Sequence, residues 1–155
     1  MTDVLNSILN SYWDLCIPIR TDKIANSLGL TLQPMINDYS YHLRLYFKDG
    51  RRIIEYNEKD TTQNIRKYIA FGISKFVNSK VSLNEVQKFD DSIFKQKENL
   101  SHIWDIDFAM KMIVPDSALK FMVHKEKIYA PSDLAIKFDT DSEIITLRLK
   151  ECHLL

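Results

Sequence analysis

The chain has 155 residues, of which 45% are hydrophobic and 27% charged, and its 21 basic side chains balance 21 acidic ones. This length and composition fit one folded domain with a sizeable core, and they exclude a disordered chain. A neutral total charge gives no support for a long phosphate-binding surface, so we do not expect a nucleic-acid partner.

The sequence also carries signals about its compartment. Cys16 and Cys152 lie near opposite ends without CxxC spacing, which indicates two free thiols rather than a metal knot or a disulfide framework. The first residues lack the pattern of a signal peptide, and no apolar run approaches the ~20 residues of a membrane span. We therefore expect a cytoplasmic protein without a membrane partner.

The beginning of the chain is predicted to form two helices and a strand. Apolar side chains recur with helical spacing over Val4–Leu15, and Pro18 interrupts that pattern. Thr21 is placed to cap a second short helix, which Gly29 ends. Leu30–Met35 follows as an extended segment.

The clearest local pattern is a β-hairpin. Apolar and polar side chains alternate over Tyr41–Phe47, and Arg52–Tyr56 returns as a second strand after the turn signal Asp49-Gly50. We expect these strands to form a small antiparallel sheet.

A central helix is predicted over Asn64–Val77, with Asp60 or Thr61 as its N-cap and Gln63 as a capping-box partner of Asp60. Taken alone, the segment is an amphipathic core helix. One face of it collects Ile65, Ile69, Gly72 and Phe76. Phe71 and Lys75, four residues apart, stack along one edge of that face.

The second half of the chain is predicted to be helical. The expected elements are a helix within the polar stretch Leu83–Phe94, helices at Leu100–Val114 and Ser117–His124, and a tail of two helices, opened by Pro131 and ended at Glu151, with a turn at Asp139–Asp141. The fold class is therefore α+β, mostly helical. We treat 1–155 as a single domain, with a core at 1–129 and a helix-turn-helix-like tail at 130–155 packed on it.

Two polar side chains on the Leu100–Val114 helix need an explanation. His102 and Asp105 lie three residues apart in an apolar stripe, and buried polar groups are costly unless they are paired. They are either a residual metal or catalytic pair, or a hydrogen-bonded structural pair, with Lys75 as an alternative partner of Asp105. The remaining histidines, His42, His124 and His153, lack a second ligand at a recognisable spacing and are expected at the surface.

Four segments in this order resemble the ImmA/IrrE-like metallopeptidases, regulators in phages, mobile elements and bacterial stress responses. Ile17–Leu32 resembles their opening segment, and the hairpin with the Arg66–Phe76 helix resembles their sheet and zinc helix. Asp105–Pro115 is similar to the family pattern ANxFAxxLLMP, and Leu134–Leu155 to the closing pattern xLAxxFxVSxxAxxxRL. The matched residues are Phe108, Ala109, Pro115, Leu134, Ala135, Phe138, Ser142, Arg148 and Leu149. The resemblance implies a zincin-like domain and repressor-like DNA-binding proteins as partners.

The chain departs from this family at the residues that carry its chemistry. Where the family has HExxH, this chain has Phe71, Gly72 and Lys75. Phenylalanine has no lone pair for zinc, and glycine offers no general base. His102 or Asp105 is the positional neighbour of the acidic third ligand. We treat these five residues as vestigial active-site positions, and no catalytic, metal-binding or cofactor role transfers to them.

These departures favour a pseudopeptidase that binds a regulatory protein partner without cutting it. In this interpretation Lys75 replaces the positive charge of zinc, and Asp105 receives it. One alternative is an active metal-dependent peptidase with a relocated site, built from His102, Asp105 and either His42 or His124. A further alternative is a DNA-binding regulator acting through the tail, although its last helix offers only Arg148 and Lys150 beside Glu143 and Glu151.

Overall fold

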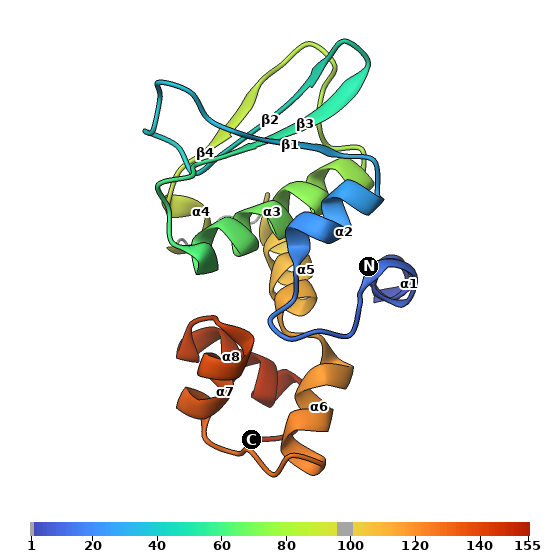
Figure 1. Cartoon of the computed structure of the whole chain (residues 1–155), viewed down its shortest axis with the longest axis vertical. Helices are drawn as coiled ribbons and strands as arrows, with labels where there is room; N and C mark the ends of the chain where they lie inside the picture. The colour runs from blue at the N-terminus through green and yellow to red at the C-terminus, as the bar shows by residue number, and fades with distance from the viewer. Residues whose placement is uncertain (1, 96–100) are drawn as a thin grey trace.

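The computed structural model of the chain describes residues 2–95 and 101–155. Within these ranges the fold is mixed α/β, with eight helices and a four-stranded sheet (Figure 1). The elements in chain order are α1 (Thr2–Tyr12), α2 (Thr21–Ser27), β1 (Thr31–Pro34), β2 (Leu43–Lys48), β3 (Arg51–Tyr56), α3 (Thr62–Val77), β4 (Gln87–Phe89), α4 (Ser92–Lys95), α5 (Ile103–Ile113), α6 (Asp116–His124), α7 (Pro131–Phe138) and α8 (Ser142–Glu151).

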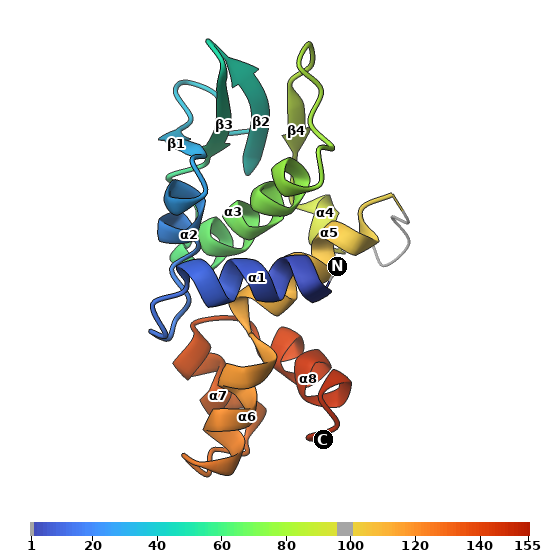
Figure 2. The same ribbon diagram turned by 90° about the vertical axis from the view of Figure 1, so that its right-hand side faces the viewer.

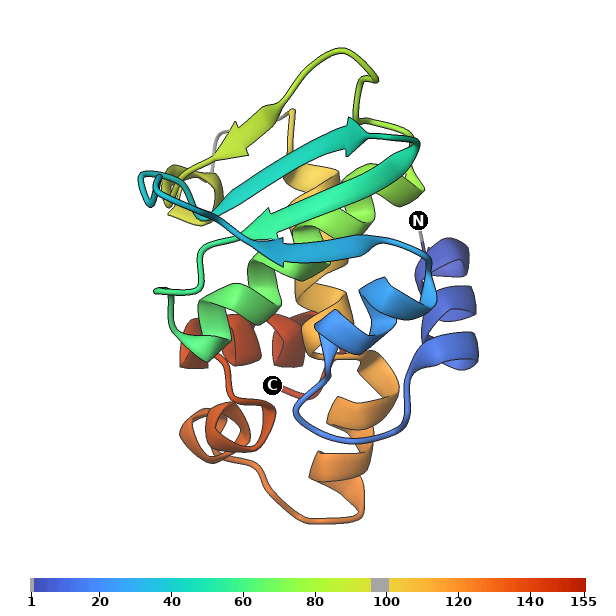
Figure 3. The same ribbon diagram turned by 45° about the horizontal axis from the view of Figure 1, so that its top comes forward.

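The sheet has the strand order β1-β3-β2-β4 (Figure 3). The hairpin is confirmed: β2 and β3 are antiparallel, and Asp49 and Gly50 between them both have positive φ, 52° and 73°, as a type I′ turn requires. β1, however, runs parallel to β3, with Thr31 opposite Ile53. The expectation of a purely antiparallel sheet is therefore wrong, because residues 35–42 lead the chain past β3 before β2 begins.

The predicted helix at Leu83–Phe94 is also wrong. This stretch instead contains β4, which pairs with β2 so that Phe89 lies opposite Leu43. The pairing covers the first half of the free edge of β2, from Leu43 to Leu45, and it buries the Phe89 side chain. A long-range pairing of this kind overrides the weak local helical pattern, and only the four-residue α4 is helical there.

The central helix α3 lies against the sheet, with α2 and α5 packed on its other sides (Figures 1 and 2). Nine consecutive residues, Tyr68–Phe76, are buried, so this half of the helix is enclosed all round rather than amphipathic. Gly72 gives the sheet its close approach: a Cβ there would lie 3.1 Å from Leu45 Cδ2 and 3.2 Å from Ile54 Cδ1. The tight packing explains why glycine stands in the middle of a helix.

Two capping predictions need correction. Thr61 caps α3, and its side chain accepts a hydrogen bond from the Asn64 backbone N–H, but Asp60 and Gln63 form no capping box. Asp60 instead pairs with His42, and Gln63 donates to Asp139 near the other end of the chain. Likewise, Thr21 does not cap α2: its hydroxyl donates to the Arg66 carbonyl at 2.9 Å and so ties α2 to α3.

The last three helices lie at the end of the molecule opposite the sheet, and α1 crosses between the two parts (Figure 2). The predicted bounds of α8 are those observed, and Pro131 opens α7 as expected. α5 begins only at Ile103, so His102 precedes the helix, and Leu100 lies outside the described residues. Arg66 donates to the Asp139 carbonyl at 3.0 Å, which joins α3 to the turn between α7 and α8. Within the described ranges, none of the helices is long and apolar enough to cross a membrane.

Candidate functional site

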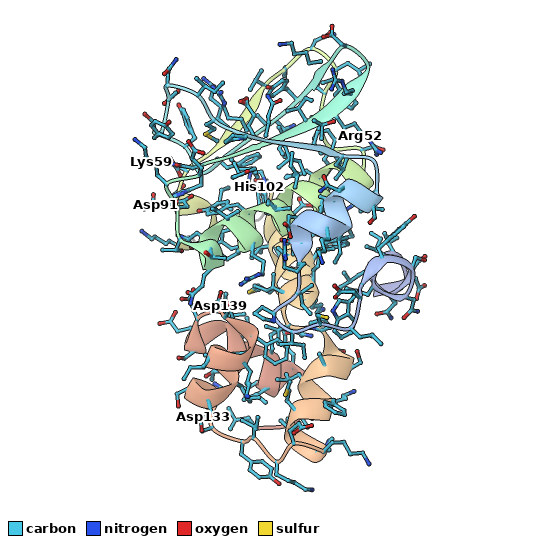
Figure 4. The ribbon with its side chains drawn as sticks, in the orientation of Figure 1. Arg52, Lys59, Asp91, His102, Asp133 and Asp139 are labelled. Carbon is cyan, nitrogen blue, oxygen red and sulfur yellow. The ribbon has the colours of Figure 1, made fainter. Side chains whose placement is uncertain are left out.

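Four of the five positions singled out in the sequence, Phe71, Lys75, His102 and Asp105, meet where α3 and α5 pack against each other, whereas Gly72 faces the sheet. α3 contributes Ser74 and Lys75, α5 contributes Asp105, and His102 stands just before α5. Figure 4 labels His102, which lies in the upper half of the molecule, and Asp139, below the start of α3. Ser74, Lys75, His102 and Asp105 each have a hydrogen-bond or ion-pair partner within the site.

Asp105 is the centre of this network and is fully buried. Its Oδ1 accepts a hydrogen bond from Ser74 Oγ at 2.5 Å, and its Oδ2 accepts one from Lys80 Nζ at 3.1 Å. The same Oδ2 forms an ion pair with Lys75 Nζ, 3.0 Å away. Both carboxylate oxygens are thus satisfied by donors, as a buried charge requires. The predicted pairing of Lys75 with Asp105 is confirmed.

His102 is the second partner of Lys75. The Lys75 ammonium has only donors, so His102 Nδ1, 2.8 Å away, accepts from it and the imidazole proton resides on Nε2. Burial and the neighbouring Lys75 charge lower the pKa of His102, because both disfavour a second positive charge there. His102 is therefore a neutral acceptor that helps to hold Lys75.

Phe71 closes the site on the side of β4 and α4. Its ring is fully buried and lies edge-on to Phe89, with centroids 5.0 Å apart, and to His102, 5.9 Å apart. Lys75 Nζ lies 5.4 Å from the Phe71 centroid, so these two residues do share one edge of the helix, as predicted. Gly72 points the other way, toward β2 and β3. Apolar bulk thus fills the Phe71 side of the site, and Phe71 offers no ligand atom to it.

This set of residues does not fit zinc. Phe71 and Gly72 supply no ligand, and the Lys75 ammonium is already paired with Asp105 and hydrogen-bonded to His102. Asp105 has no oxygen left without a donor. In the part of the chain that the structure describes, no three His, Cys, Asp or Glu side chains form a group that could hold a metal ion.

No protein-family model matches this chain. No curated protein matches it in sequence either. The resemblance to ImmA/IrrE-like metallopeptidases therefore rests on the matched residues of the sequence alone.

The other histidines are not part of this network. His42 is half-buried rather than exposed: its Nδ1 lies 2.5 Å from Asp60 Oδ2, and its ring stacks on Tyr68 with centroids 4.7 Å apart. His124, at the end of α6, and His153 are exposed. The relocated peptidase site would need His42 or His124 beside His102 and Asp105. His42 instead pairs with Asp60 and stacks on Tyr68, and His124 is exposed at the end of α6.

Arg148, one of the two cations of the last helix, is unavailable to DNA. Its side chain is 1% exposed and forms ion pairs with Asp116 and Glu151, while its Nε donates to the Val114 carbonyl at 3.1 Å. Burial in this setting indicates a packing role that joins α6 to α8. Lys150 remains as the exposed cation of α8.

Two residues of the site, Ser74 and Lys80, were not predicted from the sequence. Ser74 stands one residue before Lys75, in an otherwise largely apolar stretch, and that isolated hydroxyl was the available signal. Lys80 lies beyond the end of α3, where its backbone N–H donates to the Lys75 carbonyl at 2.9 Å. No periodic pattern points from that loop to Asp105.

Proposed function

We propose that this protein is a catalytically inactive relative of the ImmA/IrrE-like metallopeptidases, with a zincin-like fold, that acts as a regulatory protein-binding module. The observation that carries the proposal is the buried ion pair of Lys75 with Asp105, between the two helices where the family holds its metal. An ammonium there supplies positive charge to a carboxylate, as zinc would, but it cannot activate water.

The neighbouring residues support the same interpretation. Phe71 occupies the position of a metal-binding imidazole, and Gly72 replaces the general base and packs against the sheet. A change at only one of these positions would lower the activity of a peptidase. Together with Lys75 they leave neither ligand nor base, while α3 remains firmly packed.

The expected partner is a repressor-like DNA-binding protein, in the regulation of a phage, a mobile element or a stress response. This expectation comes from the resemblance. It is compatible with a neutral chain, because binding a DNA-binding protein does not require a DNA-binding surface of its own.

The test mixes the purified chain with candidate repressors from the genomic neighbourhood of its gene. Size-exclusion chromatography with light scattering should show a complex, and denaturing gels should show intact repressor with zinc and with chelator alike. Zinc-dependent cleavage of the repressor would refute the proposal. A mock preparation from the same expression host without this chain serves as a control, because cleavage found in it would come from a contaminating protease.

A further inference from the structure

A groove about 970 Å³ in volume lies between α5 and α8, and Lys67 of α3 and Phe94 of α4 also line it. Its walls are mostly apolar, and some of their side chains are open to solvent: Ile103 is 46% exposed and Leu147 is 40% exposed. The further apolar residues that line it are Phe94, Trp104, Ile106, Met110 and Ile144.

The two walls have the geometry of a helix-binding groove. On α5 the side chains of Ile103, Ile106 and Met110 recur at i, i+3 and i+7, and on α8 Ile144 and Leu147 recur at i and i+3. Each wall is therefore one stripe of a helix, and the two stripes face a common space. An amphipathic helix with apolar side chains at the same spacing would complete the packing.

Lys67, on α3, lines one end of this groove and is unusual among the cations of the chain. It is half-buried, and its Nζ lies 4.6 Å from the Phe94 ring centroid. Within residues 2–95 and 101–155 it forms no ion pair or hydrogen bond, whereas the other buried or half-buried lysines and arginines each donate to a carboxylate or carbonyl. Those residues are Arg44, Arg52, Arg66, Lys75, Lys111 and Arg148.

The environment of Lys67 favours an added anion. Burial lowers the pKa of Lys67, although the charges of Asp141 and Asp60 oppose that effect from beyond ion-pair distance. A carboxylate in direct contact with Lys67 Nζ would raise the pKa of Lys67 again, because it favours the charged form that burial disfavours. The groove thus presents apolar stripes along its length, and Lys67 lies there without a direct ion pair to any described residue, although Asp107, Asp141 and Glu143 also line the groove.

We propose that the groove between α5 and α8 binds an amphipathic helix of the partner protein, with an aspartate or glutamate of that helix paired to Lys67. This proposal rests on the proposed function, which it extends by naming the surface and the chemistry of the partner segment. The apolar stripes supply affinity, and the Lys67 pair fixes the position of the helix along the groove.

The first experiment identifies what occupies the groove. The full chain carrying p-benzoylphenylalanine in place of Leu147 is irradiated in a lysate of the native host, and the cross-linked segment is sequenced by mass spectrometry. The matched control carries the same group in place of Ile136, which is 76% exposed on α7 and outside the groove. We expect a cross-link from position 147 alone, to a helical segment with an acidic residue beside its apolar stripe.

The second experiment measures the pair. A synthetic peptide of the cross-linked segment should bind Lys67→Met and Leu147→Arg about tenfold more weakly than the natural chain, and Ile136→Arg equally well. Exchanging the acidic residue of the peptide for lysine should weaken binding to the natural chain and restore it with Lys67→Glu. Restoration by this exchange would not occur if Lys67 only supported the fold.

Three results would overturn the groove proposal: a cross-link to a second copy of this chain, a cross-linked segment without an acidic residue, or no cross-link above the Ile136 control. If repressor complexes form but position 147 does not cross-link, the proposed function stands and the groove proposal fails. If an acidic helix cross-links but zinc-dependent cleavage is found, the reverse holds.

Discussion

Lys75 Nζ lies 3.0 Å from Asp105 Oδ2, and both side chains are almost completely buried, at 5% and 0% exposed. This pair joins α3 to α5 in the interior of the protein. A buried ion pair stabilises a fold mainly through the cost of breaking it, because removal of either partner leaves an uncompensated charge.

Asp105→Asn should lower the free energy of unfolding by about 3 kcal/mol, because Lys75 would remain buried without its carboxylate. Urea denaturation followed by circular dichroism measures the change. The matched control is Asp107→Asn on the same helix: Asp107 pairs with Lys111 at 2.9 Å, but both side chains are about a quarter exposed, so the loss should be at most about 1 kcal/mol. Equal losses in the two variants would contradict the central role of Asp105.

Gly72→Ala should destabilise the protein, although alanine is the better helix former by about 1 kcal/mol. The added Cβ would press on Leu45 and Ile54, both fully buried, and overpacking of this kind costs about 1–3 kcal/mol. We expect a net loss of about 1 kcal/mol in thermal or urea denaturation. A gain in stability would show that α3 has room to move away from the sheet.

The pH dependence of stability should carry a contribution from His102. Its pKa is lowered in the folded state, so between that value and the unfolded value near about 6.5 the unfolded chain binds more protons. This contribution is complete above about pH 6.5 and is lost as the pH falls below it. His102→Gln should therefore lose less stability than the natural chain when the buffer changes from about pH 7.5 to about pH 5.5. Parallel pH profiles of the two proteins would contradict this assignment.

Arg148→Met should destabilise the protein by about 1–3 kcal/mol and increase amide hydrogen exchange in α6 and α8, because it leaves the buried Val114 carbonyl without its donor and removes the cation that joins Asp116 to Glu151. Lys150→Ala, two residues away on the exposed face of α8, should change the stability by less than about 0.5 kcal/mol. If instead Arg148 supported DNA binding, its replacement would leave the fold intact and reduce binding to DNA.

The sequence predicted those elements that local chemistry determines. The Asp49-Gly50 turn allows positive φ and so determines the hairpin, and Pro131 and Asp139 mark the ends of α7. Lys75 and Asp105 could be paired because each is a charge in an apolar stripe, which must find a partner. In these cases the type of residue was enough to predict the turn, the helix end or the ion pair.

Long-range pairings could not be predicted in this way. The polar stretch that contains β4 becomes a strand because β2 offers a free edge, and the parallel direction of β1 depends on where residues 35–42 lead. Likewise, the pairing of His42 with Asp60, 18 residues apart, follows from the sheet being in place. Contacts between distant segments leave no periodic signal in a single sequence.

The central claim is that an ion pair, and no metal, holds α3 and α5 together where Lys75 meets Asp105. Titration of metal-free protein with zinc in an isothermal calorimeter tests it most directly. We expect no stoichiometric binding at micromolar concentration and an unchanged melting temperature in the presence of zinc. One equivalent of zinc bound tightly by the natural chain, and lost in both His102→Gln and Asp105→Asn, would contradict the account.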